Sequence, residues 1–274
     1  DTPMADISLT AGIRSNLLAL QSTSSLLART QERLSTGKKV NSPIDNPTNY
    51  FTAQALTNRA TDLTARLDGI SKGINTVKAA DAGIKSMTSL LKQAKGVAQD
   101  ARALSSDTND SQAKVDRSAL ATRFNSLMTQ ITELAKDSGY DGVNLLNEDD
   151  LTVEFAEKAG SSSIDLEGFS TDLNGDVLKV QTAAVNTWQG IAGANSNIDD
   201  VIKNIETSEA NLRNESKKLS ANLGVLTARQ DFVKTLSNVL TTGAADLTNA
   251  DLNEEAANLL ALNTQQSLGV NALS

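Results

Sequence analysis

Residues 198–240 read IDDVIKNIETSEANLRNESKKLSANLGVLTARQDFVKTLSNVL, with no proline and a single glycine, Gly224. Alternating steps of four and three residues along this stretch mark thirteen positions, and nine of them carry aliphatic side chains. They are Ile198, Ile202, Ile205, Leu212, Leu219, Leu223, Leu226, Val233 and Leu240. This spacing predicts one helix, roughly 65 Å long, that packs lengthwise against another helix. The chain must supply that partner, because a lone apolar stripe is not stable in water.

The same spacing occurs once more, between Leu63 and Ala98, and predicts the partner helix. Thr61 or Asp62 is the expected N-cap of this helix, and Ser196 or Asn197 that of the first. The partner helix contains four glycines, which lower its intrinsic stability, so we expect packing to hold it together. The residues predicted to pack the two rods together are Leu67, Ile70, Ile74, Leu91, Ile205, Leu212, Leu219 and Leu226.

Each end of the chain carries a further amphipathic helical pattern. The first pattern ends at Gly37, before two prolines, and the last begins at an Asp251/Glu254 pair that resembles a capping box. Gly243 is expected to break the long helix before that start. The apolar residues predicted to form a subunit interface on these terminal helices are Ile13, Leu17, Leu20, Leu27, Leu34, Leu252, Leu259, Val270 and Leu273.

The middle of the chain changes character after a third helical pattern that includes Phe124 and Ile131. Leu151, Val153 and Phe155 alternate with polar residues, and the alternation returns around Ile164. This pattern predicts a β-hairpin near residues 151–169. The predicted fold is mainly α: long antiparallel, coiled-coil-like helical rods with a small central β-hairpin region and helical termini. We assign residues 1–45 to an N-terminal helix with its connector, 46–240 to the rod domain and 241–274 to a C-terminal helix.

The composition excludes several classes of protein. Aromatic residues are only 3% of the chain, which favours aliphatic helix stripes over a compact enzyme core. The chain has no Cys and no His, so thiolate sites and the commonest general base are absent, and we predict no enzyme, no metal and no cofactor. A net charge of −8 argues against nucleic acid as a partner. No apolar run is long enough to insert in a membrane, and no ordinary secretory signal is expected at the start.

Several short motifs have both a functional and a structural interpretation. The acids at 148–150 and 172–176 could hold a cation, but turns without ligand spacing are the preferred interpretation. Trp188 is expected to fill space in the core, and Lys38 and Lys39 to complement a helix C-terminus or a neighbouring subunit. The terminal seams could be a self-assembly surface or two halves of an intramolecular bundle. Their position at both chain ends, beyond Pro/Gly connectors, favours self-assembly and predicts that they order fully only in a polymer.

Several motifs, in order, resemble those of bacterial flagellins. They are LSTGKKVNS at 34–42 with Asp45-Asn46, the Asp68-Gly69-Ile70 run, YDGVNLL at 140–146, and the terminal pattern at 251–273. The resemblance covers essentially Met4 to Ser274. It implies a structural subunit that self-assembles into the extracellular bacterial flagellar filament for motility, with the terminal helices as its inner tube. Only about 30 residues separate the hairpin from the second rod, so the large outer variable domains of many flagellins are expected to be absent.

The resemblance also implies partners and a route. Flagellins leave the cell by type III export and meet an export chaperone and a filament cap. Family members extend about a dozen residues past the position of Ser274, so we expect this chain to be trimmed at its C-terminus. Flagellins that the innate immune receptor detects carry an Arg-rich run where this chain has Gln93 to Ala98, which predicts weak recognition.

Two alternative functions remain at this point. A hook-filament junction protein shares the terminal helices with flagellins. An intracellular coiled-coil adaptor would show the same heptads, but it would need neither the hairpin nor seams at both termini.

Overall fold

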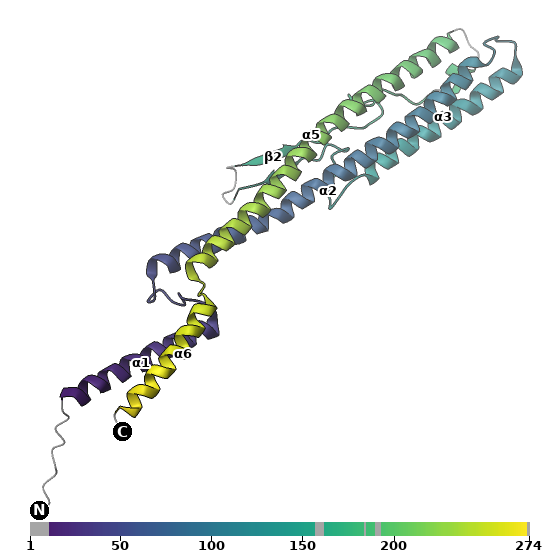
Figure 1. Cartoon of the computed structure of the whole chain (residues 1–274). Helices are drawn as coiled ribbons and strands as arrows, with labels where there is room; N and C mark the ends of the chain where they lie inside the picture. Colours follow the sequence, from purple (N-terminus) through teal and green to yellow (C-terminus); the bar gives the residue numbers. More distant parts are fainter. Residues whose placement is uncertain (1–10, 157–161, 184, 190–192, 273–274) are drawn as a thin grey trace, which may run out of the picture. The chain divides into compact units, whose positions relative to one another are not determined.

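The computed structural model describes residues 11–156, 162–183, 185–189 and 193–272. These residues form six helices and one two-stranded antiparallel sheet (Figure 1). The elements in order are α1 (Ala11–Thr36), α2 (Pro47–Ala103), α3 (Ser111–Asp137), β1 (Leu151–Glu154), β2 (Ser163–Leu166), α4 (Val185–Trp188), α5 (Ala194–Thr248) and α6 (Leu252–Asn271). The predicted mainly α fold with its small hairpin is confirmed.

The chain divides into two compact units, and α2 and α5 each contribute to both. The first unit contains Asp1–Thr61 and Leu236–Ser274, and the second contains Asp62–Thr235. The boundaries at 45/46 and 240/241 that we assigned from the sequence stay predictions.

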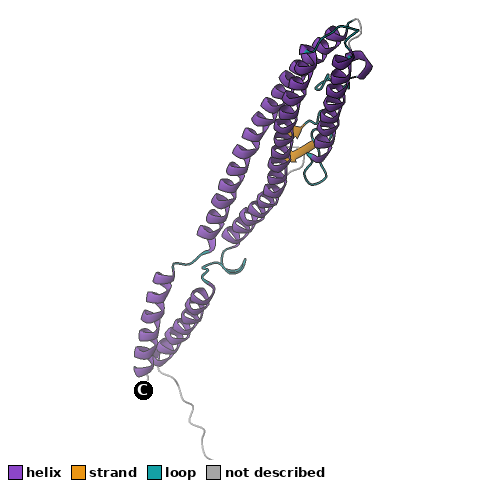
Figure 2. Ribbon diagram, turned by 90° about the vertical axis from the view of Figure 1, so that its right-hand side faces the viewer, coloured by secondary structure: helices purple, strands orange, loops and turns teal. Residues whose placement is uncertain are grey.

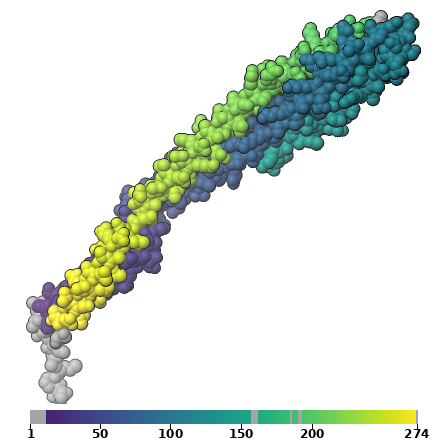
Figure 3. All heavy atoms as spheres, turned by 45° about the vertical axis from the view of Figure 1, so that its right-hand side comes forward, coloured from purple at the N-terminus to yellow at the C-terminus, as the bar shows by residue number. Residues whose placement is uncertain are grey.

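In the second unit, α2, α3 and α5 lie side by side, and their side chains fill the space between the ribbons (Figure 3). From Ile198 on, the buried apolar residues of this part of α5 follow each other at intervals of seven: Ile198, Ile205, Leu212, Leu219, Leu226 and Val233. The seam positions between them, such as Glu209 and Ser216, are half-buried. The long helix therefore buries one apolar residue per heptad and leaves the second seam position of each heptad partly exposed.

The hairpin pairs Leu151 with Leu166 and Val153 with Ile164. It lies against the helices of the second unit (Figure 2), with Val153 and Leu166 buried. Its strands are only four residues long, and an isolated pair of this size is marginally stable in water. The hairpin thus depends on the helices beneath it.

Predicted helix boundaries were wrong in three places. α2 begins at Pro47 and passes through Thr61 and Asp62, and α5 begins at Ala194, before both Ser196 and Asn197. α5 also continues through Gly243 to Thr248, where a Cβ on that glycine would lie 3.6 Å from Leu56 Cδ1 of α2. A helix that runs past a possible N-cap loses only about 1 kcal/mol of capping energy, and an interior glycine costs about the same. Packing between the helices outweighs both local preferences.

Other boundary predictions are confirmed. Gly37 follows α1 with a φ of 70°, and its N–H donates to the carbonyl oxygen of Arg33 at 2.8 Å. Asp251 caps α6 by accepting hydrogen bonds from the N–H groups of Asn253 and Glu254. Left-handed backbone and side-chain capping are set by local chemistry, so the sequence alone identifies them.

Arg117 on α3 is a residue of the core that the sequence patterns did not predict. It is fully buried, and its Nη2 donates to the carbonyl oxygen of Leu104 at 2.6 Å and to Oδ1 of Asn195 at 2.8 Å. Burial lowers the pKa of its guanidinium, with a smaller contribution from nearby Arg102. Trp188 is also buried, with its ring 5.3 Å from that of Phe124, so its predicted role in filling the core is confirmed.

Candidate assembly surface

The first unit holds the surface with the most direct bearing on function, the pair formed by α1 and α6. The two helices pack against each other along their length. A Cβ placed on Gly269 of α6 would lie 2.7 Å from Cδ2 of Leu20 on α1, so any larger residue there would require the Leu20 side chain to shift. The two terminal helices therefore pair within one chain, which is one of the two arrangements that the sequence left open.

Polar side chains are buried on these helices, and an ion pair joins the last turn of α1 to the first turn of α6. Thr23 and Thr30 of α1 are buried, and Arg33 Nη1 forms an ion pair with Glu255 Oε1 at 2.8 Å. Glu255 itself is 7% exposed. A carboxylate buried this far is costly unless it is paired, so this ion pair fixes how the two helices meet.

The segments that join α1 to α2 and α5 to α6 are held together by backbone hydrogen bonds. The N–H groups of Lys39 and Val40 donate to the carbonyl oxygen of Thr248, and that of Ala250 donates to Gly37. Lys39 Nζ also donates to the carbonyl oxygen of Asp246, in the last turn of α5. Lys39 thus complements a helix C-terminus, one of its two predicted roles.

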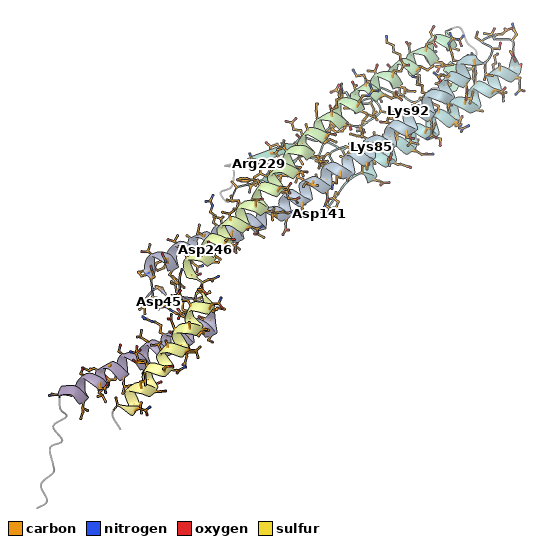
Figure 4. All side chains as sticks on the ribbon, viewed as in Figure 1. Asp45, Lys85, Lys92, Asp141, Arg229 and Asp246 are labelled. Carbon is orange, nitrogen blue, oxygen red and sulfur yellow. The ribbon has the colours of Figure 1, made fainter. Side chains whose placement is uncertain are left out.

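Asp45 organises the connector between α1 and α2 (Figure 4). Its Oδ2 accepts hydrogen bonds from the N–H groups of Asn41 at 3.0 Å and Ser42 at 2.9 Å. The backbone N–H of Ser42 and then that of Asn41 lower the pKa of Asp45. The ionised carboxylate therefore holds the bend before Pro47.

Much of the apolar surface of the two helices faces away from their mutual contact. These exposed residues are Ile13, Leu17, Leu18, Leu26, Leu252, Leu260, Leu268 and Val270, with exposed fractions from 39% to 69%. Single exposed apolar side chains are ordinary on a protein surface, but a series of them along one helix pair is typical of an interaction site.

The structure separates the predicted interface residues into two groups. Leu20, Leu27, Leu34 and Leu259 are half-buried, whereas Ile13, Leu17, Leu252 and Val270 are exposed, and Leu273 lies outside the described residues. Leu18, Leu260 and Leu268 are more exposed than any of these, although the sequence spacing did not select them. A helix with leucines on several faces leaves open, from its sequence, which face meets its partner.

The predicted rod-packing residues lie in the second unit. Ile70, Ile74, Leu91, Ile205, Leu212, Leu219 and Leu226 are buried there, and Leu67 is half-buried. Among the acids at 148–150, Asp149 accepts from the N–H of Asn144 in its own turn, and Asp150 accepts from the N–H of Gly168, which follows β2. No cluster of three potential metal ligands occurs in the part of the chain that the structure describes.

Comparison with known proteins identifies the family of this chain. Residues 8–150 match the family model described as the bacterial flagellin N-terminal helical region. The chain is 31% identical over 261 residues to flagellin FljO of Caulobacter vibrioides, covering 94% of this chain and 90% of that protein. The chain belongs to the bacterial flagellin family. Flagellin FljK of the same organism is 30% identical over 98% of this chain and 93% of its own length, and a Brucella melitensis flagellin is 27% identical over 99% and 95%.

As a flagellin, the chain is a structural subunit of the flagellar filament, and its family serves motility. Flagellins polymerise, and this family is structural rather than enzymatic. Among the described helices, none combines the length and the apolar character needed to cross a membrane.

Proposed function

We propose that the outward-facing apolar side chains of α1 and α6 are the surface through which copies of this flagellin join. The observation that carries the proposal is the exposure of Leu260 at 69%, Leu18 at 66% and Leu268 at 64% on helices that already pack against each other. Full burial of one such side chain contributes about 1.5–3 kcal/mol. A subunit that meets several neighbours multiplies this contribution, so a polymer can be stable without disulfides.

The remaining parts of the proposal rest on family membership. We infer that the chain works outside the cell, that it leaves by type III export, and that an export chaperone and the filament cap are its partners. Innate immune recognition is expected to be weak, because Gln93 stands where recognised flagellins carry the first arginine of their run. No enzymatic activity, cofactor, nucleic acid or membrane insertion is proposed.

Seeded polymerisation tests the proposed surface. The purified chain is incubated with short filament fragments from cells that produce the protein, and polymer is measured by sedimentation and negative-stain microscopy. The variant Leu260→Ser/Leu268→Ser should raise the critical concentration at least about tenfold, because 1.4 kcal/mol corresponds to a factor of ten.

Ala261→Ser is the matched control, since it places the same side chain at an exposed position of α6 that offers little apolar area. Circular dichroism of each monomer checks that helix content is unchanged. Polymerisation of the double variant at the wild-type critical concentration would contradict the proposed surface. A wild-type chain that stays monomeric with seeds at every concentration would contradict the proposal that these helices join copies of the chain.

A further inference from the structure

Two grooves of opposite charge lie on the two flanks of α5 in the second unit. The first has a volume of about 340 Å³, lies between α2 and α5, and is lined by Lys85, Lys92 and Arg213 with one acid, Glu209. The second has a volume of about 420 Å³ and lies between α5 and the segment around β2. Asp165, Glu167 and Glu215 line it, with one base, Lys218. We call the three bases of the first groove the basic patch and the three acids of the second groove the acidic patch.

The basic patch has charge that its own chain leaves uncompensated. Lys85 Nζ is held by Asp81 at 2.7 Å, but Lys92 and Arg213 form no ion pair with any described residue (Figure 4 labels Lys85 and Lys92). Glu209 has one carboxylate oxygen that is buried and accepts no hydrogen bond from the described part of the chain. A groove with two cations that no described residue pairs fits a partner that offers carboxylates.

The acidic patch offers carboxylates, of which that of Glu167 has no ion pair within the described chain. Lys218 Nζ donates to Glu215 Oε1 at 2.8 Å, and Glu215 and Glu167 together raise the pKa of Lys218. Glu167 is exposed and forms no ion pair with the described residues, while Asp165 accepts a hydrogen bond from Thr152 at 2.8 Å. One ammonium group among three carboxylates mirrors the composition of the basic patch.

The helical period of α5 keeps the two patches apart. Leu212 and Leu219 are buried in the seam. At 100° per residue, Glu209 and Arg213 project to one side of that seam, and Glu215 and Lys218 to the other. A two-fold pairing through either patch alone would oppose like charges. Two complementary patches at different places on one molecule instead form a head-to-tail contact, which repeats without closing when the rotation permits.

We propose that the basic patch of one copy binds the acidic patch of a neighbouring copy, as a lateral contact between rod units in the filament. The proposal rests on the proposed self-assembly and adds a second surface to it. Because the charges are exposed, they orient neighbouring copies and supply less affinity than the apolar helices do. The contact should therefore weaken as salt rises.

Charge reversal with restoration tests the contact. Lys92→Glu and Glu167→Lys, made singly, should each raise the critical concentration for seeded polymerisation about threefold or more in 50 mM salt, because each replaces an attraction with a repulsion. The double variant K92E/E167K restores opposite charges across the same contact, so its critical concentration should return to within about twofold of wild type. Both single effects should fade in 0.5 M salt, where screening is short-ranged.

Lys203→Glu is the matched control, because it reverses an exposed lysine of α5 that lines neither groove. The lateral contact would be overturned if the single variants had the same critical concentration as this control. It would also be overturned if the critical concentration of the double variant were higher than that of both single variants. If Leu260→Ser/Leu268→Ser still raises the critical concentration in that case, the proposed function stands and only this inference fails.

Discussion

Three of the four interior glycines of α2, Gly69, Gly83 and Gly96, should not all respond in the same direction to substitution by alanine. A Cβ on Gly69 or Gly96 would meet no atom within 4 Å, whereas one on Gly83 would lie 2.3 Å from Ser138 Oγ, 2.7 Å from Leu146 Cδ1 and 2.8 Å from Ser138 Cβ. Ser138 cannot move freely, because its hydroxyl donates to the carbonyl oxygen of Leu134 at 2.6 Å. Gly83 therefore marks a close approach, and Gly69 and Gly96 do not.

The magnitudes follow from two opposing effects. Gly→Ala in an open helical position gains about 0.8–1 kcal/mol of helix stability, so Gly96→Ala and Gly69→Ala should each raise the free energy of unfolding by about that amount. At Gly83 the same gain is offset by overpacking of about 1–3 kcal/mol. Because the added Cβ would lie less than 3 Å from Ser138, the overpacking cost at this site should be near the upper end of that range. Gly83→Ala should therefore lower the free energy of unfolding by about 1–2 kcal/mol.

Urea and thermal unfolding of the monomer, followed by far-ultraviolet circular dichroism, measure these changes. A change of 1 kcal/mol moves the Tm by about 2–4 °C in a domain of this size. Equal or greater stability of Gly83→Ala relative to wild type would show that α3 and the turn after it do not approach α2 as described. A loss of stability in Gly96→Ala would show that the open space beside that glycine is filled in solution.

Three further results are expected. Arg117→Ala should lower the free energy of unfolding by about 2–4 kcal/mol in urea titrations, because it leaves the carbonyl oxygen of Leu104 and Oδ1 of Asn195 without a charged donor. Arg117→Lys should cost less. Equal stability of the Ala and Lys variants would contradict the role of Arg117 as a buried donor. Since the folded state lowers the pKa of Asp45 below its ordinary value of 3.8, the stability that this carboxylate contributes is fully present above that pH and is lost as the pH falls through the lower folded value. The amide shifts of Asn41 and Ser42 in an NMR titration should follow this transition, and Asp45→Asn should abolish it. Glu255→Ala should weaken the contact between α1 and α6 by about 1.5–3 kcal/mol, seen as faster thermolysin cleavage of α6 in the monomer; unchanged cleavage would rule out a role for the ion pair with Arg33.

The sequence alone determined the architecture of this flagellin. Aliphatic residues at heptad spacing cannot be left in water, so the pattern at 198–240 requires a long helix and a partner, and α5 and α2 supply both. The end of α1 at Gly37 and the N-cap of α6 at Asp251 were also predictable, because each residue acts within one turn of its own helix. The alternation around Val153 was likewise enough to predict the hairpin.

Only the tertiary structure decided how these elements meet. The sequence contained the glycines of α2 but not the neighbours that distinguish Gly83 from Gly96, and it contained Gly243 but not the packing against Leu56 that carries α5 through it. The division of the terminal leucines into covered and exposed sets also depends on which face of α6 meets α1. Contacts between residues far apart in the chain decide these points, and a helical repeat fixes spacing along one helix but not the rotation of that helix against its partner.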